Sequence, residues 1–164
     1  MEKTIYIAGG CFWGVEAYYD LLKGVIKTTV GYINGSSENP SYKDLKAGKA
    51  DHAEAVEIVY DDDAISLETL LGHYLRFVDP YSVDKQGGDV GHQYRTGVFY
   101  VYEGDASLIK NYLDSTLRKG YAIEVGPMKN FYNAEEYHQK YLEKNPDGYC
   151  HINLSLVKPS ERKK

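Results

Sequence analysis

Hydrophobic positions along the chain follow two spacings, which predict alternating strands and helices. Runs that are rich in β-branched residues or alternate in polarity predict five strands, at residues 3–8, 25–33, 52–60, 97–102 and 123–126. Between them, apolar residues recur at helical spacing. The predicted helices cover residues 12–23, 67–78, 106–119 and 134–144, with one or two further turns at 42–47.

Local signals mark where several of these helices begin and end. Ser66 is a favourable N-cap before the clearest amphipathic stripe, and Asp105 has the same place before the next helix. Asn133 and Glu136 have the spacing of a capping box, which predicts a helix that reaches Lys144.

The order of these elements predicts an α+β fold. We expect a two-layer sandwich with a ferredoxin-like core, in which helices pack on one face of a mainly antiparallel, mixed sheet. A doubly wound α/β fold is the alternative, although only a short loop and turn separate the second and third strands. We expect one catalytic domain over residues 1–164, with a C-terminal tail from about residue 145. The polar loop at residues 81–95 is long for a compact domain, which favours a functional role.

Composition narrows the possible partners and the location of the protein. The net charge is −5 and the one basic cluster ends the chain, so we expect no nucleic-acid partner. No segment approaches the roughly 20 apolar residues of a membrane span, and the N-terminus has no signal-peptide pattern. We therefore expect a cytoplasmic protein without a membrane partner, in which the only two cysteines, Cys11 and Cys150, remain thiols unless catalysis oxidises them.

The first cysteine lies where the first strand turns into a helix, within the stretch Gly-Gly-Cys-Phe-Trp-Gly at residues 9–14. The free N–H groups of a first helical turn favour a negative charge, which predicts that the Cys11 thiolate forms easily. Phe12 and Trp13 could wall an apolar pocket beside it. The alternative is that Cys11 is a small buried hydrophobe and the two rings belong to the core.

Glu54 is the candidate acid. Strand alternation places it on the same face as Val56, Ile58 and Tyr60. A carboxyl on an apolar face is desolvated, which raises its pKa and keeps it protonated near neutral pH, as acid catalysis needs. The alternative is that this face meets water near the end of the strand and Glu54 is a surface charge.

Five motifs in order resemble the methionine sulfoxide reductase A family over nearly the whole chain. They are Gly-Cys-Phe-Trp-Gly at 10–14, Asn-Pro-Ser-Tyr at 39–42, His-Ala-Glu-Ala-Val at 52–56, the pair Gly-Asp at 88–89 with Gln-Tyr-Arg at 93–95, and Gly-Tyr-Cys-His at 148–151. One such motif is weak support, whereas five in sequence are strong.

The resemblance implies a role for each residue that it covers. Cys11 is the nucleophile that attacks the sulfoxide sulfur, and Glu54 protonates the departing oxygen. The same resemblance makes Tyr42 and Tyr94 hydrogen-bond donors to that oxygen and places Asp89 in a water network with Glu54. Phe12 and Trp13 are then expected to hold the ε-methyl group of the substrate.

The resemblance also implies how the enzyme is recycled. Cys11 is left as a sulfenic acid, Cys150 resolves it as a disulfide, and thioredoxin or another dithiol restores both thiols. No bound cofactor and no metal are expected. The substrate is the S epimer of methionine sulfoxide, free or in peptides and proteins. Residues 78–85 match the family pattern only loosely, and Tyr81 and His92 are bulkier than it predicts.

Other functions are weaker interpretations of the same residues. A Cys-His hydrolase lacks a local signature around any of the five histidines, and a zinc site lacks ligand spacing. The glycines at 9, 10 and 14 lack the spacing of a phosphate loop. A tyrosine-rich redox-sensing or peptide-binding domain, oxidised by peroxide without turnover of a sulfoxide, is the remaining alternative.

Overall fold

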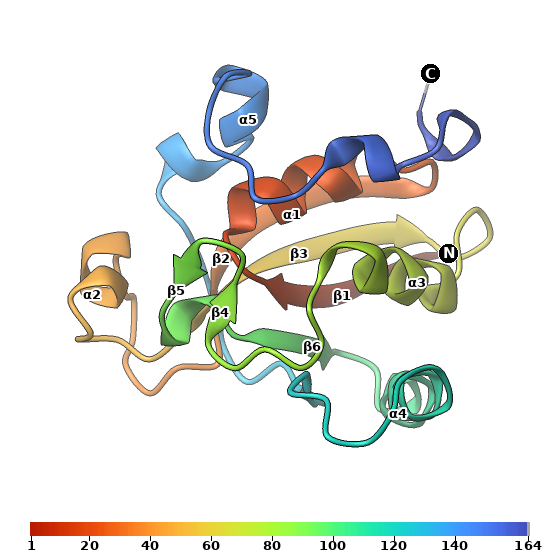
Figure 1. Ribbon diagram of the computed structural model, residues 1–164, viewed down its shortest axis with the longest axis horizontal. Coiled ribbons are helices and arrows are strands. Elements are labelled where there is room, and N and C mark those ends of the chain that lie inside the picture. Colours follow the sequence, from red (N-terminus) through yellow and green to blue (C-terminus); the bar gives the residue numbers. More distant parts are fainter. Residues whose placement is uncertain (164) are drawn as a thin grey trace.

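The computed structural model describes residues 1–163, and their main feature is a six-stranded sheet with helices on one face (Figure 1). The helices and strands, in chain order, are β1 (Glu2–Gly9), α1 (Phe12–Asp20), β2 (Val25–Ile33), α2 (Tyr42–Lys46), β3 (Ala53–Asp61), α3 (Leu67–Phe77), β4 (Lys85–Gln86), β5 (Asp89–Val90), β6 (Thr96–Tyr100), α4 (Gly104–Thr116), β7 (Glu124–Pro127), β8 (Phe131–Asn133) and α5 (Tyr141–Lys144).

The strand order β7-β6-β1-β3-β2-β8 contains the predicted ferredoxin-like core. Four central strands, β6, β1, β3 and β2, pair antiparallel, and α1 and α3 make the two crossovers between them. At one edge β7 pairs parallel to β6, and at the other β8 pairs antiparallel to β2. The sheet is therefore mixed and mainly antiparallel, as predicted, and it is not the doubly wound alternative.

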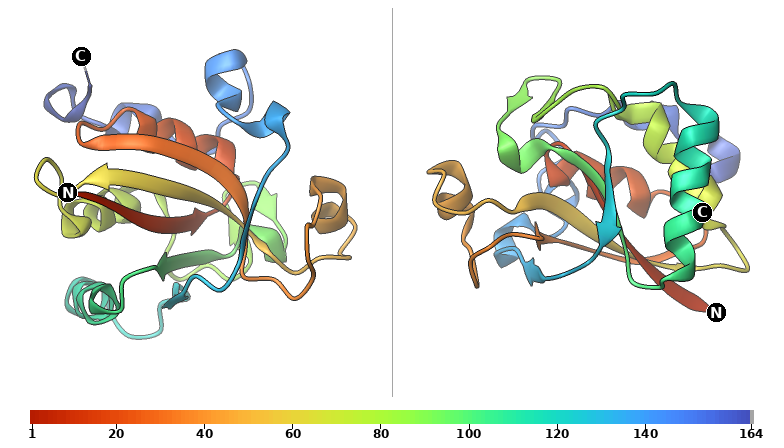
Figure 2. Two further views of the ribbon diagram at one scale, coloured as in Figure 1. Left: turned by 180° about the vertical axis from the view of Figure 1, so that it is seen from behind. Right: turned by 90° about the horizontal axis from the view of Figure 1, so that it is seen from below.

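Two apolar clusters cover the two faces of the sheet. The larger one joins β1, β2 and β3 to the apolar sides of α1, α3 and α4, and residues such as Ile58, Tyr19 and Leu70 in it are fully buried. The smaller one lies on the other face, around Tyr6 and Phe99. Seen from behind in Figure 2, the chain that leads from β7 into β8 crosses that second face, on which Met128 and Phe131 pack. The helices therefore cover only the face to which α1 belongs.

The predicted helix at residues 134–144 is wrong. Residues 131–133 form β8 instead, and they are followed by a 3₁₀ turn (Glu136–His138) and the four-residue α5. The side chain of Gln139 bonds both backbone groups of Val30, at 3.0 and 2.9 Å, so this segment lies along the edge of β2. Lys140 then adopts a left-handed backbone with φ 54°, which no helix can contain.

Two smaller differences concern boundaries and the long loop. The helix assigned to residues 106–119 begins at Gly104 with Glu103 as its N-cap, and the helix after β1 ends at Asp20. The loop at residues 81–95 folds into a small hairpin of β4 and β5, followed by a 3₁₀ turn (His92–Tyr94). Within residues 1–163, no helix is long and apolar enough to cross a membrane.

Candidate active site

Cys11 is the N-cap of α1 and lies in the short turn between β1 and that helix. Its side chain is buried, with 7% of its surface exposed. Gly10 makes the turn possible: its φ is +90°, and a Cβ there would lie 2.7 Å from Nε2 of His151 and 2.8 Å from Cβ of Gln86. A side chain at residue 10 would therefore push the C-terminal tail and the β4 strand away from the sulfur.

Glu54 lies on β3 and points at the start of α1. Only 1% of its surface is exposed. The backbone N–H of Phe12 donates to Oε1 at 3.2 Å, and the side-chain amide of Gln93 donates to Oε2 at 3.2 Å. Burial raises the pKa of Glu54 to about 7, although both hydrogen bonds oppose the shift. The carboxyl can therefore hold or release a proton near neutral pH.

The thiol of Cys11 behaves differently from the sequence prediction. Burial raises its pKa, and the nearby carboxyls of Glu54 and Asp89 raise it further. The backbone N–H of Trp13 lowers the pKa, as the helix start predicts, but it is outweighed. Without substrate, the sulfur therefore keeps its proton.

Tyr42 and Tyr94 meet beside Glu54. Tyr42 begins α2, and Tyr94 ends the 3₁₀ turn after the β4–β5 hairpin. Burial and the negative charge of Glu54 raise the pKa of both phenols, that of Tyr42 to about 12. Nζ of Lys46 lies 3.5 Å from the Tyr94 hydroxyl and over both rings. Two protonated phenol hydroxyls therefore lie close to the Glu54 carboxyl.

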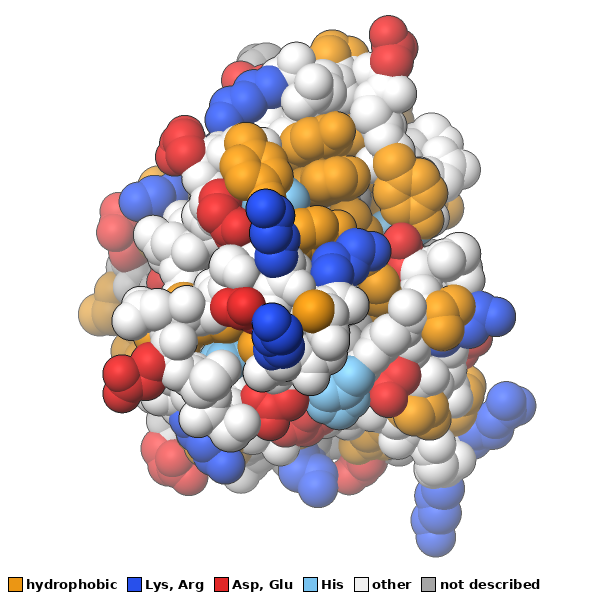
Figure 3. Space-filling view, turned by 90° about the vertical axis from the view of Figure 1, so that its left-hand side faces the viewer, with side chains coloured by type: hydrophobic (Ala, Val, Ile, Leu, Met, Phe, Trp, Pro, Cys, Tyr) orange, Lys and Arg blue, Asp and Glu red, His pale blue; other side chains and the backbone are white. Residues whose placement is uncertain are grey.

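Aromatic rings form the wall on the other side of Cys11. Phe12 is buried against Tyr32 and His138, with ring centroids 5.8 and 5.2 Å away. Trp13 is half-buried; its Nε1–H donates to Nδ1 of His138 at 2.9 Å, and its ring stacks on Tyr141 at 3.7 Å. Figure 3 shows this side of the molecule, with hydrophobic side chains gathered in its upper part and framed by acidic and basic ones.

Asp89 contacts the C-terminal tail. Its Oδ2 accepts from the Tyr149 hydroxyl at 3.0 Å and lies 3.8 Å from Nδ1 of His151. The direct partner of Glu54 in this region is Gln93 rather than Asp89. Asp89 therefore joins the β5 strand to the segment that carries the second cysteine.

Cys150 lies over the first turn of α1. It is half-buried, its thiol donates to the carbonyl of Ile152 at 3.2 Å, and a Cβ on Gly14 would come within 3.2 Å of its sulfur. Nε2–H of the neighbouring His151 donates to the carbonyl of Gly9, 3.0 Å away. The tail thus brings both cysteines to the same end of α1, although they lie near opposite ends of the sequence. Both are free thiols.

The two bulky residues that depart from the family pattern are tied to other parts of the chain. The hydroxyl of Tyr81 bonds the backbone of Arg118, whose guanidinium lies 4.5 Å from the centre of the Tyr81 ring. His92 is exposed and lies 3.2 Å from Oδ1 of Asp84. Both side chains therefore fix the loop that carries Asp89 and Tyr94.

Sequence reasoning missed two residues of this site. Gln93 is inside a motif that we singled out, yet its contact with Glu54 spans 39 residues and has no local signal. His138 lies in a segment that was predicted as a helix, and its ring packs against those of Tyr42, Phe12 and Trp13. Burial in the centre of an aromatic cluster, which no short motif reveals, gives His138 its place.

Acidic residues that could share a cation gather at the opposite end of β3. Among residues 1–163 one group has metal-like proximity, Asp61, Asp62 and Asp63, and it surrounds the N-terminal ammonium group. This cluster belongs to the strand end that is remote from Cys11. Nothing in its contacts connects it to the thiols.

A buried thiol beside a carboxyl that can hold a proton near neutral pH, with a second thiol over the same helix turn, is typical of the class of thiol-dependent oxidoreductases. Residues 3–164 match the family model described as peptide methionine sulfoxide reductase. The chain is 55% identical over 155 residues to the peptide methionine sulfoxide reductase MsrA of Lachnoclostridium phytofermentans, a match that covers 93% of each chain.

Solved structures agree with this match. Reduced Mxr1 of Saccharomyces cerevisiae aligns with a TM-score of 0.84 at 38% identity, over 93% of this chain and 91% of that one. Mxr1 in complex with Trx2 aligns with a TM-score of 0.59 at 28% identity, over 85% of this chain and 84% of that one. The chain belongs to the peptide methionine sulfoxide reductase family, as its motifs predicted. It is a peptide-methionine (S)-S-oxide reductase with the α+β fold of that family.

Proposed function

We propose that Cys11 carries out the reduction by attacking the sulfur of methionine S-sulfoxide. Two electrons pass from the thiol to the sulfoxide: the sulfoxide sulfur loses its oxygen and leaves as methionine, and Cys11 is left as a sulfenic acid that holds the oxygen. The placement of the sulfur at a helix N-cap, buried beside Glu54, is the observation that carries this assignment.

Glu54 is the acid in this proposal. A sulfoxide sulfur becomes electrophilic when its oxygen takes a proton or strong hydrogen bonds, so the site needs an acid that is still protonated near neutral pH. With a pKa of about 7, Glu54 meets that need. The raised pKa of Cys11 fits the same scheme, because a thiol that stays protonated until substrate binds is protected from other oxidants.

The phenols and the aromatic wall position the substrate. The hydroxyls of Tyr42 and Tyr94 donate to the sulfoxide oxygen, where charge develops. Phe12 and Trp13 hold the ε-methyl group, since an apolar surface selects that end of the substrate over the oxygen. Asp89 acts less directly, through its contacts with Tyr149 and the tail.

Cys150 then resolves the sulfenic acid by forming a disulfide with Cys11 and releasing water. Its position over Gly14 supports this step, because the two sulfurs approach the same helix turn. An external dithiol reduces the disulfide. The complex of the yeast relative with Trx2 supports thioredoxin as that reductant, and no cofactor bound to the chain is needed. The whole chain acts as one catalytic domain, with residues 145–164 as its resolving tail.

Substrates are free methionine S-sulfoxide and the same group in peptides and proteins, so that the enzyme repairs oxidised methionine. A reductant-free single turnover tests the cycle: reduced protein is mixed with a peptide that carries either the S or the R epimer, and released methionine and remaining thiols are counted. We expect about one equivalent of methionine from the S epimer alone, with loss of both thiols as a Cys11–Cys150 disulfide. Loss of both thiols to peroxide, without methionine from either epimer, would reject the cycle and leave a redox sensor.

A further inference from the structure

Trp13 is held on two sides by one short segment of the chain. Nδ1 of His138 accepts the indole N–H at 2.9 Å, and the ring of Tyr141 stacks on the indole with an interplanar angle of 8°. His138 also packs against Tyr42, with ring centroids 4.6 Å apart. The position of the indole therefore depends on whatever fixes residues 138–141 against α1.

Apolar packing fixes His138, which is buried among aromatic rings, but it does not fix the residues that follow. α5 has four residues and none of them is buried. Beside it lies a cavity of about 310 Å³, which Trp13, Leu142 and Leu154 line together with polar side chains of α1. A single helical turn next to an open cavity has too little buried surface to hold its own position.

Besides the bonds from Gln139 to Val30, Glu16 makes a short hydrogen bond with the segment. It lies one turn after Trp13 on α1, with 2% of its surface exposed. Its Oε1 accepts the backbone N–H of Lys140 at 2.7 Å, between the two residues that hold the indole. Lys140 has a left-handed backbone, which costs about 1 kcal/mol in a residue with a side chain and persists only where its surroundings fix it.

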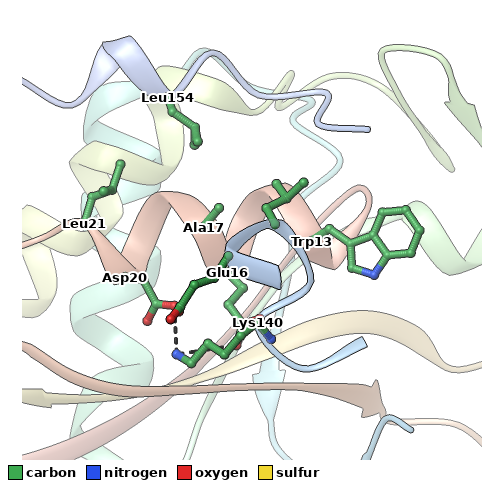
Figure 4. Close-up of a pocket in the computed structure, with 9 residues that line it drawn as sticks. Trp13, Glu16, Ala17, Asp20, Leu21, Lys140 and Leu154 are labelled. Atoms are coloured by element: carbon green, nitrogen blue, oxygen red, sulfur yellow. Dashed lines mark hydrogen bonds and ion pairs between the residues drawn. The ribbon is translucent and has the colours of Figure 1, made fainter. Parts of the chain in front are cut away.

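Polar contacts support this link from β2 and α1. The hydroxyl of Thr28 bonds Oε2 of Glu16 at 2.9 Å, and Nζ of Lys140 lies 2.7 Å from Asp20 and from the same hydroxyl. Figure 4 shows Glu16, Asp20 and Lys140 converging below α1, with Trp13 at the far end of the cavity. One helix thus carries both the indole and the groups that anchor the residues around it.

We propose that Glu16 is a positioning residue for reduction of methionine sulfoxide: through the backbone of Lys140 it fixes His138 and Tyr141, and these orient the indole of Trp13. The inference rests on the proposed role of Trp13 in holding the substrate methyl group. A wall that contacts the methyl group equally in the bound substrate and in the transition state affects KM rather than kcat.

The chain contains one tryptophan, so its fluorescence reports on Trp13 alone. In Glu16→Ala we expect greater quenching of this fluorescence by acrylamide, together with a KM for a peptide S-sulfoxide that rises about two- to tenfold while kcat stays within twofold. Glu16→Gln keeps an oxygen that can accept the Lys140 N–H, and it should restore both readouts. Asp105→Ala removes another buried carboxyl, on α4, and should leave the quenching as it is.

Wild-type quenching and wild-type KM in a folded Glu16→Ala protein would overturn the proposal. If Glu16→Ala does not fold, Glu16→Asp carries the same test, because its carboxylate is one methylene too short to reach both Lys140 and Thr28. Failure of the proposed function would look different: the wild-type protein itself would release no methionine, while the quenching series would still report whether Glu16 fixes the indole.

Discussion

Two glutamates, Glu54 and Glu16, are buried on the helix side of the sheet. Their surroundings differ in a way that suits Glu54 to donate a proton and Glu16 to hold a neighbouring segment in position. Glu54 receives hydrogen bonds from two neutral donors, the N–H of Phe12 and the amide of Gln93. Glu16 receives a backbone N–H and a hydroxyl and also lies 3.8 Å from the ammonium group of Lys140. Burial raises the pKa of both carboxyls, but at Glu16 the charge of Lys140 is the first influence that opposes it.

The difference shows how one fold uses the same side chain in two ways. A buried carboxyl with neutral partners balances its charged and uncharged forms, which suits a group that must release a proton in each turnover. An ammonium group beside a buried carboxylate stabilises its charged form, and removing the ammonium group leaves the negative charge uncompensated. The first arrangement supports chemistry and the second supports geometry.

The largest expected effect is a difference in single-turnover rate between Glu54→Gln and Glu16→Gln. Glu54→Gln removes the acid, so the single-turnover rate of S-sulfoxide reduction should fall by about 100- to 10,000-fold. Glu16→Gln keeps the acceptor for Lys140, and its rate should stay within a few-fold of wild type. Stopped-flow measurement of methionine release checks both variants. Alkylation of Cys11 by iodoacetamide is the control, and comparable rates in the two variants would mean that the acid is another group.

The next effect concerns stability and pH. The pKa of Glu54 is about 7 in the folded chain, against 4.5 for an ordinary glutamate. Between these values the unfolded chain has released a proton that the folded chain keeps, so the free energy of unfolding falls as pH rises. Glu54→Gln has no carboxyl to titrate, so its free energy of unfolding does not fall with pH for this reason. It should therefore gain up to about 3 kcal/mol on wild type between pH 4 and pH 8, and urea unfolding at several pH values measures the gain. Parallel curves for the two proteins would contradict the raised pKa.

A smaller effect tests the neutral donor. The hydrogen bond from Gln93 lowers the pKa of Glu54, so Gln93→Met should move the alkaline limb of kcat/KM to higher pH, by about one unit or less. Gln86→Met is a matched control: Gln86 is another buried glutamine, but its amide bonds the backbone of Asp79. A limb that moves equally in both variants would show that Gln93 does not act through Glu54.

The smallest effect lies at the exposed end of the anchor. Asp20 pairs with the Lys140 ammonium group at 2.7 Å, but 27% of its side chain is exposed. Asp20→Asn should therefore cost less than about 1 kcal/mol of stability, and it should leave the fluorescence of Trp13 unchanged. Thermal unfolding and acrylamide quenching measure the two quantities. Quenching in Asp20→Asn as great as in Glu16→Ala would mean that the ammonium pair, rather than the backbone hydrogen bond, fixes the segment.

Local signals account for the parts of the fold that sequence predicted well. Ser66 caps α3 as expected, because its hydroxyl accepts the N–H of Thr69 and the apolar stripe follows at once. The helix predicted at residues 134–144 failed, because pairing of β8 with β2 and the Gln139–Val30 bonds are long-range and outweigh the capping signal. Helix propensities differ by only tenths of a kcal/mol per residue, so tertiary contacts of this kind override them.

The same division holds in the site. The alternation of β3 placed Glu54 on the apolar face, and its raised pKa followed from that burial. The helix start at Cys11 was also correct, and the backbone N–H of Trp13 there lowers the pKa of the thiol as predicted. The net shift is nevertheless upward, because burial outweighs this hydrogen bond and the depth of burial is a property of the packed fold. Gln93 and His138 reach the site through tertiary contacts alone.

The pH dependence of a reductant-free single turnover tests the central claim, that Glu54 supplies the proton, most directly. With the S epimer of a methionine sulfoxide peptide, the rate of methionine release in wild type should fall as pH rises, with an apparent pKa of about 7. The residual rate of Glu54→Gln should have no such limb. A limb near pH 7 that persists in Glu54→Gln would contradict the account and assign the proton to another group.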